Sequence, residues 1–227
     1  MPLVSVIIPT HNEGAGIAEA VNRLRHASSR FPVEIIIVDG ASTDDTVAVA
    51  QGRGARVISA LKPCRSRQMH LGAQIATGDL FVFLHADTSL PASWQEDVEQ
   101  ALIRPPNPPA AVAFRLAFDA DTWFYRLMAQ MAHWRNRLTG IPQGDQGLIV
   151  KRETYFAAGG FPDVPIMEEY VFLPKLAPWG RIQILRTCAM TSCRRYQRDG
   201  PLRTALHHTL LILLFYCGVP LRWLFRR

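Results

Sequence analysis

The sequence predicts an α/β fold with a mostly parallel central sheet flanked by helices. Short apolar, β-branched segments alternate with amphipathic segments through residues 1–84. Such uninterrupted apolar strands are typical of a parallel sheet that is covered on both faces. Two of the predicted strands are followed by an aspartate, Asp39 and Asp87. Because the carboxyl ends of parallel strands border the ligand crevice, the sequence also predicts a ligand site at that edge.

The first half of the chain carries three strand–helix units and a fourth strand. Ile17, Val21 and Leu24 recur at helical spacing and mark one buried stripe of the first helix. The predicted elements are a strand at residues 4–9, a helix at 14–27, a strand at Val33–Asp39, a turn at 40–43, a helix at 44–51, a strand at 55–59, a helix at 65–76 and a strand at 80–84.

A cluster of prolines then interrupts the pattern at Pro105, Pro106, Pro108 and Pro109. Proline lacks a backbone donor and stiffens the chain, so we expect a break there and an α+β arrangement beyond it. The elements predicted after the break are a strand at Ala111–Phe118, a helix at 122–138, a strand at 147–151, a helix from about Arg152 and a helical segment at 168–176.

The C-terminal segment differs in kind from the rest. Residues 209–219 are apolar almost without interruption, and Arg222, Arg226 and Arg227 follow. This run is shorter than the ~20 residues that span a bilayer. We therefore predict a domain at residues 1–200 and an apolar, basic helix at 201–227. This helix either packs on the domain or lies on a membrane surface.

Composition narrows the function classes. The net charge of +6 favours an anionic partner such as a diphosphate or lipid headgroups. Basic residues do not interleave with aromatic residues at strand spacing, so we expect no nucleic-acid partner. Glu19 stands where a dinucleotide-binding turn needs glycine or alanine, which argues against NAD or FAD.

Two features bear on location. The cysteines, Cys64, Cys188, Cys193 and Cys217, have no zinc spacing and no C-x-x-C pair, so we expect free thiols in a reducing compartment. The chain enters an apolar strand by Val4 without the pattern of a secretion signal. A cytoplasmic location is therefore expected.

Two motifs resemble the opening of family 2 glycosyltransferases. They are Ser-Val-Ile-Ile-Pro-Thr-His-Asn-Glu at residues 5–13 and Ile-Ile-Val-Asp-Gly-Ala-Ser-Thr-Asp-Asp-Thr at residues 36–46. The resemblance implies the GT-A fold, whose nucleotide-binding α/β sheet takes a nucleotide-diphospho sugar. It also implies that Pro9, Thr10 and Glu13 line the nucleoside pocket and that Asp39 binds the base or ribose. Turn and helix-cap chemistry with Ser42 is the alternative role of Asp39, and both roles are compatible.

The resemblance extends to the diphosphate and metal region. Arg65 and Arg67 open a predicted helix and are expected to reach the donor diphosphate. His85-Ala86-Asp87 stands where the family carries its Asp-x-Asp motif, so Asp87 is the implied ligand of Mn²⁺ or Mg²⁺. His85 replaces the first aspartate of that motif. With Ala86 it is expected beside the donor rather than on the metal.

Later motifs complete the implied site. Gly144-Asp145-Gln146 is similar to segments that lie near the acceptor in related transferases. Arg194 and Arg195 resemble an arginine-rich segment that closes over the donor and would clamp its diphosphate.

Glu168-Glu169 resembles the family's Glu-Asp element, whose second acid is the general base. Glu169 is therefore the implied base, with one methylene more than the usual aspartate, and Glu168 is the alternative. Two acids favoured by a helix dipole, neither of them catalytic, are a further alternative.

The resemblance as a whole implies an inverting, metal-assisted transferase. A UDP-sugar is the default donor and a hydroxyl group the acceptor. An apolar C-terminal helix favours a lipid-linked acceptor and peripheral contact with the inner face of the cell membrane, whereas a helix that only completes the core fits a soluble acceptor. The chain most resembles a compact bacterial subgroup named for arsenosugar biosynthesis. A non-catalytic nucleotide-binding or membrane-surface protein on a decayed transferase fold is the alternative, because His85 and Glu169 replace aspartates.

Overall fold

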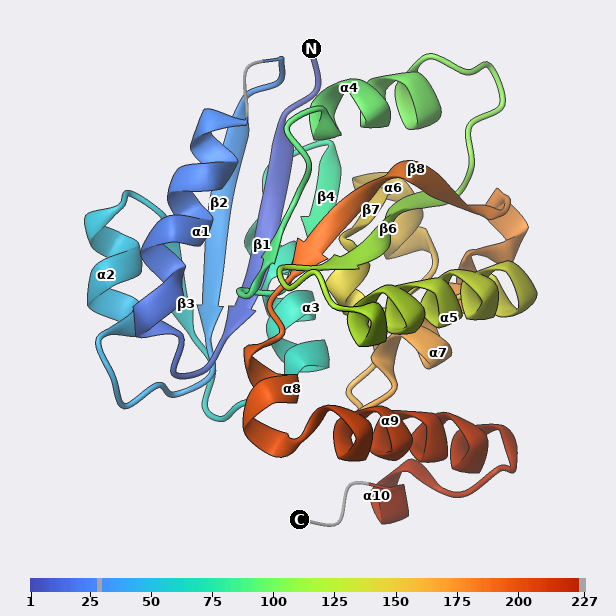
Figure 1. Cartoon of the computed structure of the whole chain (residues 1–227). Coiled ribbons are helices and arrows are strands. Elements are labelled where there is room, and N and C mark those ends of the chain that lie inside the picture. Colours follow the sequence, from blue (N-terminus) through green and yellow to red (C-terminus); the bar gives the residue numbers. More distant parts are fainter. Residues whose placement is uncertain (28–29, 225–227) are drawn as a thin grey trace.

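The computed structural model describes residues 1–27 and 30–224, and Arg226 and Arg227 of the predicted basic terminus lie outside them. In the described chain, eight strands form one sheet in the order β3-β2-β1-β4-β7-β6-β8-β5 (Figure 1). The strands are β1 (Val4–Thr10), β2 (Val33–Asp39), β3 (Arg56–Ser59), β4 (Leu80–Phe83), β5 (Thr88–Ser89), β6 (Ala111–Phe118), β7 (Leu148–Lys151) and β8 (Ile182–Thr191).

Parallel pairing aligns the strand ends that the sequence marks with polar residues. β1 pairs in parallel with β2 and β4, and β2 with β3. Thr10 at the end of β1 is in register with Asp39 at the end of β2. β7 is antiparallel to both β4 and β6, while β8 is parallel to β6. The carboxyl ends of β1, β2 and β3 therefore meet at one edge of the sheet.

Helices cover both faces of the sheet (Figure 1). The helices are α1 (Gly14–His26), α2 (Thr46–Gly52), α3 (Arg65–Ile75), α4 (Trp94–Val98), η1 (Glu99–Ile103), α5 (Trp123–Thr139), η2 (Gly144–Gln146), α6 (Arg152–Ala157), α7 (Glu168–Phe172), η3 (Leu173–Trp179), α8 (Arg194–Asp199), α9 (Pro201–Tyr216) and α10 (Leu221–Leu224).

Alternate residues of β1 divide the core into two layers. Val6 and Ile8 pack with α1, α2 and α4 on one face, around the fully buried Trp94. Ile7 packs on the other face with α3, α6 and α7. Both sides of the strand are apolar for this reason, and the continuous apolar runs of the sequence have a direct explanation.

The predictions for the first half match the structure to within two residues at each element boundary. Several later elements were missed, namely β5, α4, η1, η2, β8 and α8. In β8, the pairing with β6 jumps from Ala113↔Ile184 to Arg115↔Cys188. Extra residues on one strand break the inside–outside alternation, so β8 has no regular period to recognise.

The helix predicted at residues 168–176 is only half correct. The α-helix α7 ends at Phe172 and a 3-10 helix, η3, continues to Trp179. Pro174 lacks the N–H that would continue the α-helical ladder, which explains the change of helix type.

The C-terminal helix α9 has one face on the domain. Ile212 and Phe215 pack against the core layer of α3, α6 and α7, and the ring of Phe215 lies 5.6 Å from that of Tyr170 in α7. Leucines on its other side stay exposed. No helix within residues 1–27 and 30–224 is long and apolar enough to cross a membrane.

Candidate active site

Two loops at the carboxyl ends of β1 and β2 are held together by short polar side chains. The buried Asp39 carboxylate accepts hydrogen bonds from the backbone N–H of Ser42 at 2.9 Å and from the Thr10 hydroxyl at 3.3 Å. Asn12 adopts a left-handed φ of 56° and accepts a bond from the Thr43 N–H at 2.9 Å. Asn tolerates that conformation better than most residues, so Asn12 allows the tight turn before α1. Asp39 thus has the turn part of its predicted alternative role, whereas the helix-cap part is wrong, because α2 begins at Thr46 with Asp45 and not Ser42 at its N-cap.

Gln68 connects α3 to this edge, a role that was not predicted from the sequence. Its amide donates to the carbonyls of Thr10 at 2.8 Å and Val38 at 2.7 Å, and its oxygen accepts from the Cys64 N–H at 3.0 Å. The side chain is buried with all of these bonds satisfied. The sequence signal for this role was a polar side chain, Gln68, inside the helix predicted at residues 65–76.

Arg65 lies at the centre of an acidic cluster. Its Nε lies 3.4 Å from Oε1 of the buried Glu168. The Arg65 side chain is 49% exposed. Partial loss of water around its guanidinium lowers its pKa, but the charges of Glu168, Glu169, Asp145 and Asp87 outweigh this and raise it. We call Arg65 and these four carboxyl groups the acidic cluster. It joins residues that are up to 104 positions apart in the chain.

The acidic cluster holds a carboxyl group with an unusually high pKa. Burial raises the pKa of Glu169, the neighbouring charge of Glu168 raises it further, and Arg65 opposes both. Burial also raises the pKa of Asp145 to about 6, again against the pull of arginines. Carboxyls with pKa values displaced toward neutrality are common among groups that transfer protons in enzymes.

Gly144 is the point of closest approach in the cluster. A Cβ at this position would overlap His85 Nε2 and lie 2.7 Å from Oε1 of Glu169. His85 is held as neutral imidazole, since burial and then the charges of Arg65 and Arg195 lower its pKa to about 3. Its Nε2 is buried and has no hydrogen-bond partner within the described residues. A neutral ring beside arginines can accept a hydrogen bond from a ligand.

Asp87 connects the cluster to the loops at the ends of β1 and β2. Its carbonyl accepts a bond from the Ser192 N–H at 2.9 Å, which brings the segment before α8 alongside. Arg194 in α8 lies 3.6 Å from Glu13. Burial and then the charge of Asp87 raise the pKa of Glu13. Asp87, Ala86 and Arg194 line a cavity of about 420 Å³ between α1 and the β5–β8 edge.

Some predicted site residues have other partners. Arg67 makes two bonds of 2.8 Å to Asp163, while its neighbour Arg65 reaches the cluster. The Gln146 side chain is fully buried; it donates to the Phe114 carbonyl at 2.7 Å and accepts from Asn136 at 2.8 Å. Both residues therefore hold neighbouring segments in place in this conformation. Pro9 is buried in β1.

Two helices that the sequence did not link to the site border it. Arg135 of α5 acts electrostatically on Asp145, and His208 of α9 is close enough to Arg195 and Arg65 that their charges lower its pKa. Burial of the His208 ring is the largest cause of this shift, and together these effects lower the pKa of His208 to about 4. The ring of Tyr196 in α8 lies 6.1 Å from that of His208. α5 and α9 thus border the acidic cluster, while Arg194 of α8 faces Glu13 at the start of α1.

The carboxylate oxygens at the site suit a divalent cation that is also bound by the diphosphate of a substrate. Within residues 1–27 and 30–224, no three His, Cys, Asp or Glu side chains are grouped to hold a metal alone. Mg²⁺ and similar ions need only one or two protein carboxylates when substrate phosphates supply the other ligands. Asp87 is the available carboxylate, and the nearby Asp145 has an Oδ1 that is buried without a hydrogen-bond partner in the described chain.

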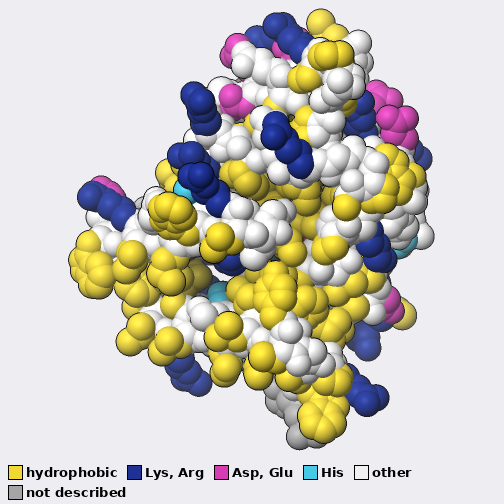
Figure 2. All heavy atoms as spheres, turned by 90° about the vertical axis from the view of Figure 1, so that its right-hand side faces the viewer, with side chains coloured by type: hydrophobic (Ala, Val, Ile, Leu, Met, Phe, Trp, Pro, Cys, Tyr) yellow, Lys and Arg dark blue, Asp and Glu magenta, His cyan; other side chains and the backbone are white. Residues whose placement is uncertain are grey.

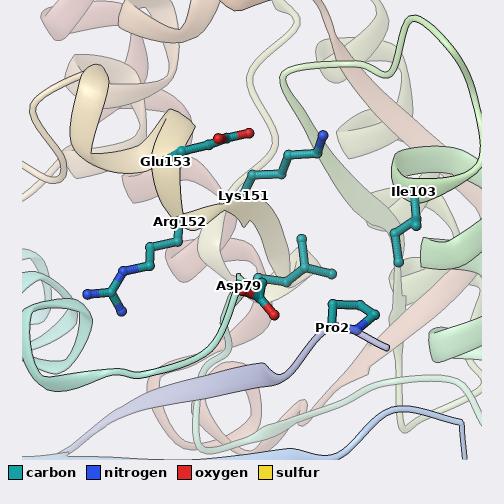
Figure 3. Close-up of a pocket in the computed structure, with 7 residues that line it drawn as sticks. Pro2, Asp79, Ile103, Lys151, Arg152 and Glu153 are labelled. Atoms are coloured by element: carbon teal, nitrogen blue, oxygen red, sulfur yellow. The ribbon is translucent and has the colours of Figure 1, made fainter.

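A second cavity of about 420 Å³ lies at the opposite edge of the sheet (Figure 3). Its lining residues are Pro2, Asp79, Leu80, Ile103, Lys151, Arg152 and Glu153. Figure 3 shows Arg152 pointing away from Ile103, and the Arg152 guanidinium lies 5.7 Å from the Phe81 ring. This cavity is at the amino ends of β1 and β4, away from the acidic cluster, and ligands of parallel sheets bind at the other edge.

The family of the chain is shown by a family model that matches most of the sequence. The model of glycosyl transferase family 2 matches residues 5–162, and the chain belongs to this family. An uncharacterized glycosyltransferase of Rickettsia felis is 36% identical over 101 residues, which are 44% of this chain and 34% of that protein. A relative from Rickettsia conorii is 33% identical over 98 residues, 42% of this chain and 33% of that protein. The chain thus spans about a third of the length of these relatives.

Solved structures confirm the GT-A fold. Glucosyl-3-phosphoglycerate synthase of Mycobacterium tuberculosis, in complex with Mn²⁺, UDP and glucosyl-3-phosphoglycerate, has a TM-score of 0.67 at 21% identity, covering 96% of this chain and 81% of that one. The mannosyltransferase PcManGT of Pyrobaculum calidifontis, in complex with GDP-Man and Mn²⁺, has a TM-score of 0.65 at 22% identity, covering 83% and 56%. At these identities the likeness shows the fold alone.

The close approach at Gly144 predicts a sensitive position. Gly144→Ala should lower kcat/KM by about a hundredfold, because His85 and Glu169 must move by a large fraction of an ångström. Gly52→Ala is the matched control, since its Cβ would meet nothing within 4 Å. Donor turnover by the two variants checks this. Equal turnover would show that the geometry around Gly144 is unimportant.

Proposed function

We propose that this chain is an inverting transferase that moves a sugar from a nucleotide-diphospho sugar to an acceptor hydroxyl with the help of a divalent cation. The observation that supports this most is the acidic cluster itself. Arg65 lies 3.4 Å from Glu168, and the charges of Glu169, Asp145 and Asp87 also act on it. Groups suited to diphosphate binding and to proton transfer therefore lie in one region of the molecule.

Glu169 is the proposed general base. It takes the proton of the acceptor hydroxyl while that oxygen bonds to the anomeric carbon, and the bond from this carbon to the donor diphosphate breaks. The raised pKa of Glu169 suits this role, because a base works best when its pKa is near the working pH. Direct displacement inverts the anomeric centre and needs no covalent intermediate.

The remaining residues handle charge and orientation. Arg65, Arg194 and Arg195 neutralise the negative charge that grows on the departing diphosphate. When bound, Mn²⁺ or Mg²⁺ on Asp87 supplies Lewis-acid stabilisation of the same charge. His85 remains neutral and accepts a hydrogen bond from the donor, with Ala86 leaving room beside it.

We propose donor and acceptor sides for the remaining predicted residues. The nucleoside of the donor is bound by Pro9, Thr10, Glu13 and Asp39. Arg67 binds the donor diphosphate after its side chain has left Asp163. Gly144, Asp145 and Gln146 form the acceptor side. UDP is the default nucleotide, since the structural relatives include complexes with UDP and with UDP-GlcNAc, and GDP-Man is bound in another.

The acceptor and the location are further parts of the proposal. The exposed leucines of α9 support a lipid-linked acceptor and peripheral contact with the inner face of the cell membrane. We also propose that the chain belongs to the compact bacterial subgroup named for arsenosugar biosynthesis. The division into a domain at residues 1–200 and a C-terminal helix at 201–227 is proposed on the same grounds, with α9 starting at Pro201.

Calorimetry tests the donor part directly. We expect one of UDP, GDP, dTDP and ADP to bind wild-type protein in a Mn²⁺-dependent manner, with NAD as the negative control. Asp87→Ala should lose the Mn²⁺ dependence, because the carboxylate that shares the ion is gone. No detectable binding of any of the four nucleotides at millimolar concentration would overturn the proposal. Binding without turnover of any donor would instead favour the non-catalytic, decayed-fold alternative.

The pH dependence of turnover tests the base. Activity should rise with pH as Glu169 loses its proton, at a pH above the ordinary carboxyl range. Glu168→Gln removes a like charge that raises the pKa of Glu169, so this limb should move to lower pH. The exposed Glu153→Gln is the charge-matched control. Abolished activity in Glu168→Gln, together with full activity in Glu169→Gln, would make Glu168 the base.

A further inference from the structure

Two helices expose long rows of large apolar side chains on the same side of the molecule. We call these side chains the apolar platform; each is between 48% and 85% exposed. They are Trp123, Leu127, Met131, Trp134 and Leu138 of α5 and Leu202, Leu206, Leu210, Leu213 and Tyr216 of α9.

The spacing makes each row a stripe along its helix. Successive members are three or four residues apart in both helices, so they lie on one helix face. The opposite faces already pack on the protein, through Tyr125 and Ala132 of α5 and Thr204 and Ala205 of α9. The platform is therefore a second apolar face on each helix, beyond what the core of this chain uses.

Figure 2 shows the apolar side chains gathered over the lower half of the molecule, in two ridges that correspond to α5 and α9. A hollow separates the ridges, and a histidine side chain is visible in it. Figure 1 places the two helices side by side with α8 between their ends. Contiguous exposed apolar surfaces of this kind mark sites of protein or membrane contact.

The charge around the platform identifies the partner. Residues 122–144 and 200–227 contain no aspartate or glutamate, whereas they contain several arginines. Arg137, Arg203 and Arg222 are exposed, and the Arg137 guanidinium lies 5.6 Å from the ring of Trp134. Arg126 is also exposed, but its charge is paired with that of Asp121 at 2.6 Å. An apolar face with tryptophan, bordered by basic residues, is typical of helices that lie in an anionic lipid interface.

We propose that the platform docks the protein on an anionic lipid bilayer, with α5 and α9 lying in the interface. Each helix supplies an apolar stripe, so two helices, and not the C-terminal helix alone, carry the contact. A second copy of this chain is a poorer partner, because its platform would bring a second set of arginines against the first. Anionic headgroups complement these arginines.

Docking in this way has a consequence for the site, which rests on the proposed function. Arg135 of α5 and His208 of α9 belong to the platform helices and also act on the acidic cluster. A bilayer against α5 and α9 would therefore place the cluster close to the lipid headgroups. An amphiphilic acceptor could then present its polar end to Glu169 without leaving the membrane.

Vesicle flotation of the full chain tests the docking itself. We expect binding to vesicles of equal parts phosphatidylcholine and phosphatidylglycerol, and weaker binding to phosphatidylcholine alone or at high salt. Leu127→Glu and Leu206→Glu, one on each helix, should each reduce partitioning by about tenfold, and the double variant by more. Leu61→Glu is the matched control, since Leu61 is 99% exposed on the loop after β3.

Three results would overturn the docking proposal. They are equal partitioning of the Leu61→Glu and platform variants, no flotation of wild-type protein, and a dimer in sedimentation experiments that the platform variants dissociate. Nucleotide binding by the same variants separates this proposal from the proposed function. The variants should retain it, because the platform side chains are exposed and away from the β1 and β2 loops.

Discussion

The Arg65 guanidinium is the interaction on which the rest of the site depends. Asp87, Asp145, Glu168 and Glu169 would repel one another in a partly dry pocket, and Arg65 is the cation that acts on all four. Burial and the charge of a neighbouring carboxylate outweigh the arginines, so the pKa values of Asp145 and Glu169 remain raised. Such a cluster can accept further positive charge, and a metal ion brought in with a diphosphate would supply it.

Much of the fold was predictable because buried strands have a recognisable apolar pattern in the sequence. A strand with helices on both faces is apolar at most positions, and β1, β2 and β4 are recognisable for that reason. β8 was not, because its bulge against β6 disrupts any period. The 3-10 segment after Phe172 depended on Pro174, whose effect within a short helical run was overlooked.

Site residues at strand ends could be predicted from the sequence. Site residues whose positions depend on tertiary contacts were harder to predict. The positions of Asp87 and Glu168-Glu169 could be read from motif resemblance, but their convergence on Arg65 could not be read from spacing. The separation of Arg65 from Arg67 depends on Asp163, which lies 96 residues away from Arg67. Gln68, Arg135 and His208 have no motif of their own. Likewise, only packing reveals which face of α5 stays exposed.

We propose that Asp87 and the diphosphate of the donor hold the cation jointly. Electron paramagnetic resonance of Mn²⁺ detects such shared binding, with the nucleoside diphosphate selected by calorimetry. We expect weak Mn²⁺ binding by protein alone and a ternary complex when nucleotide is added, beyond that of Mn²⁺ with nucleotide alone. Asp87→Asn should lose this complex. Tight Mn²⁺ binding without nucleotide, or a ternary complex unchanged in Asp87→Asn, would show that Asp87 and the diphosphate do not share the ion.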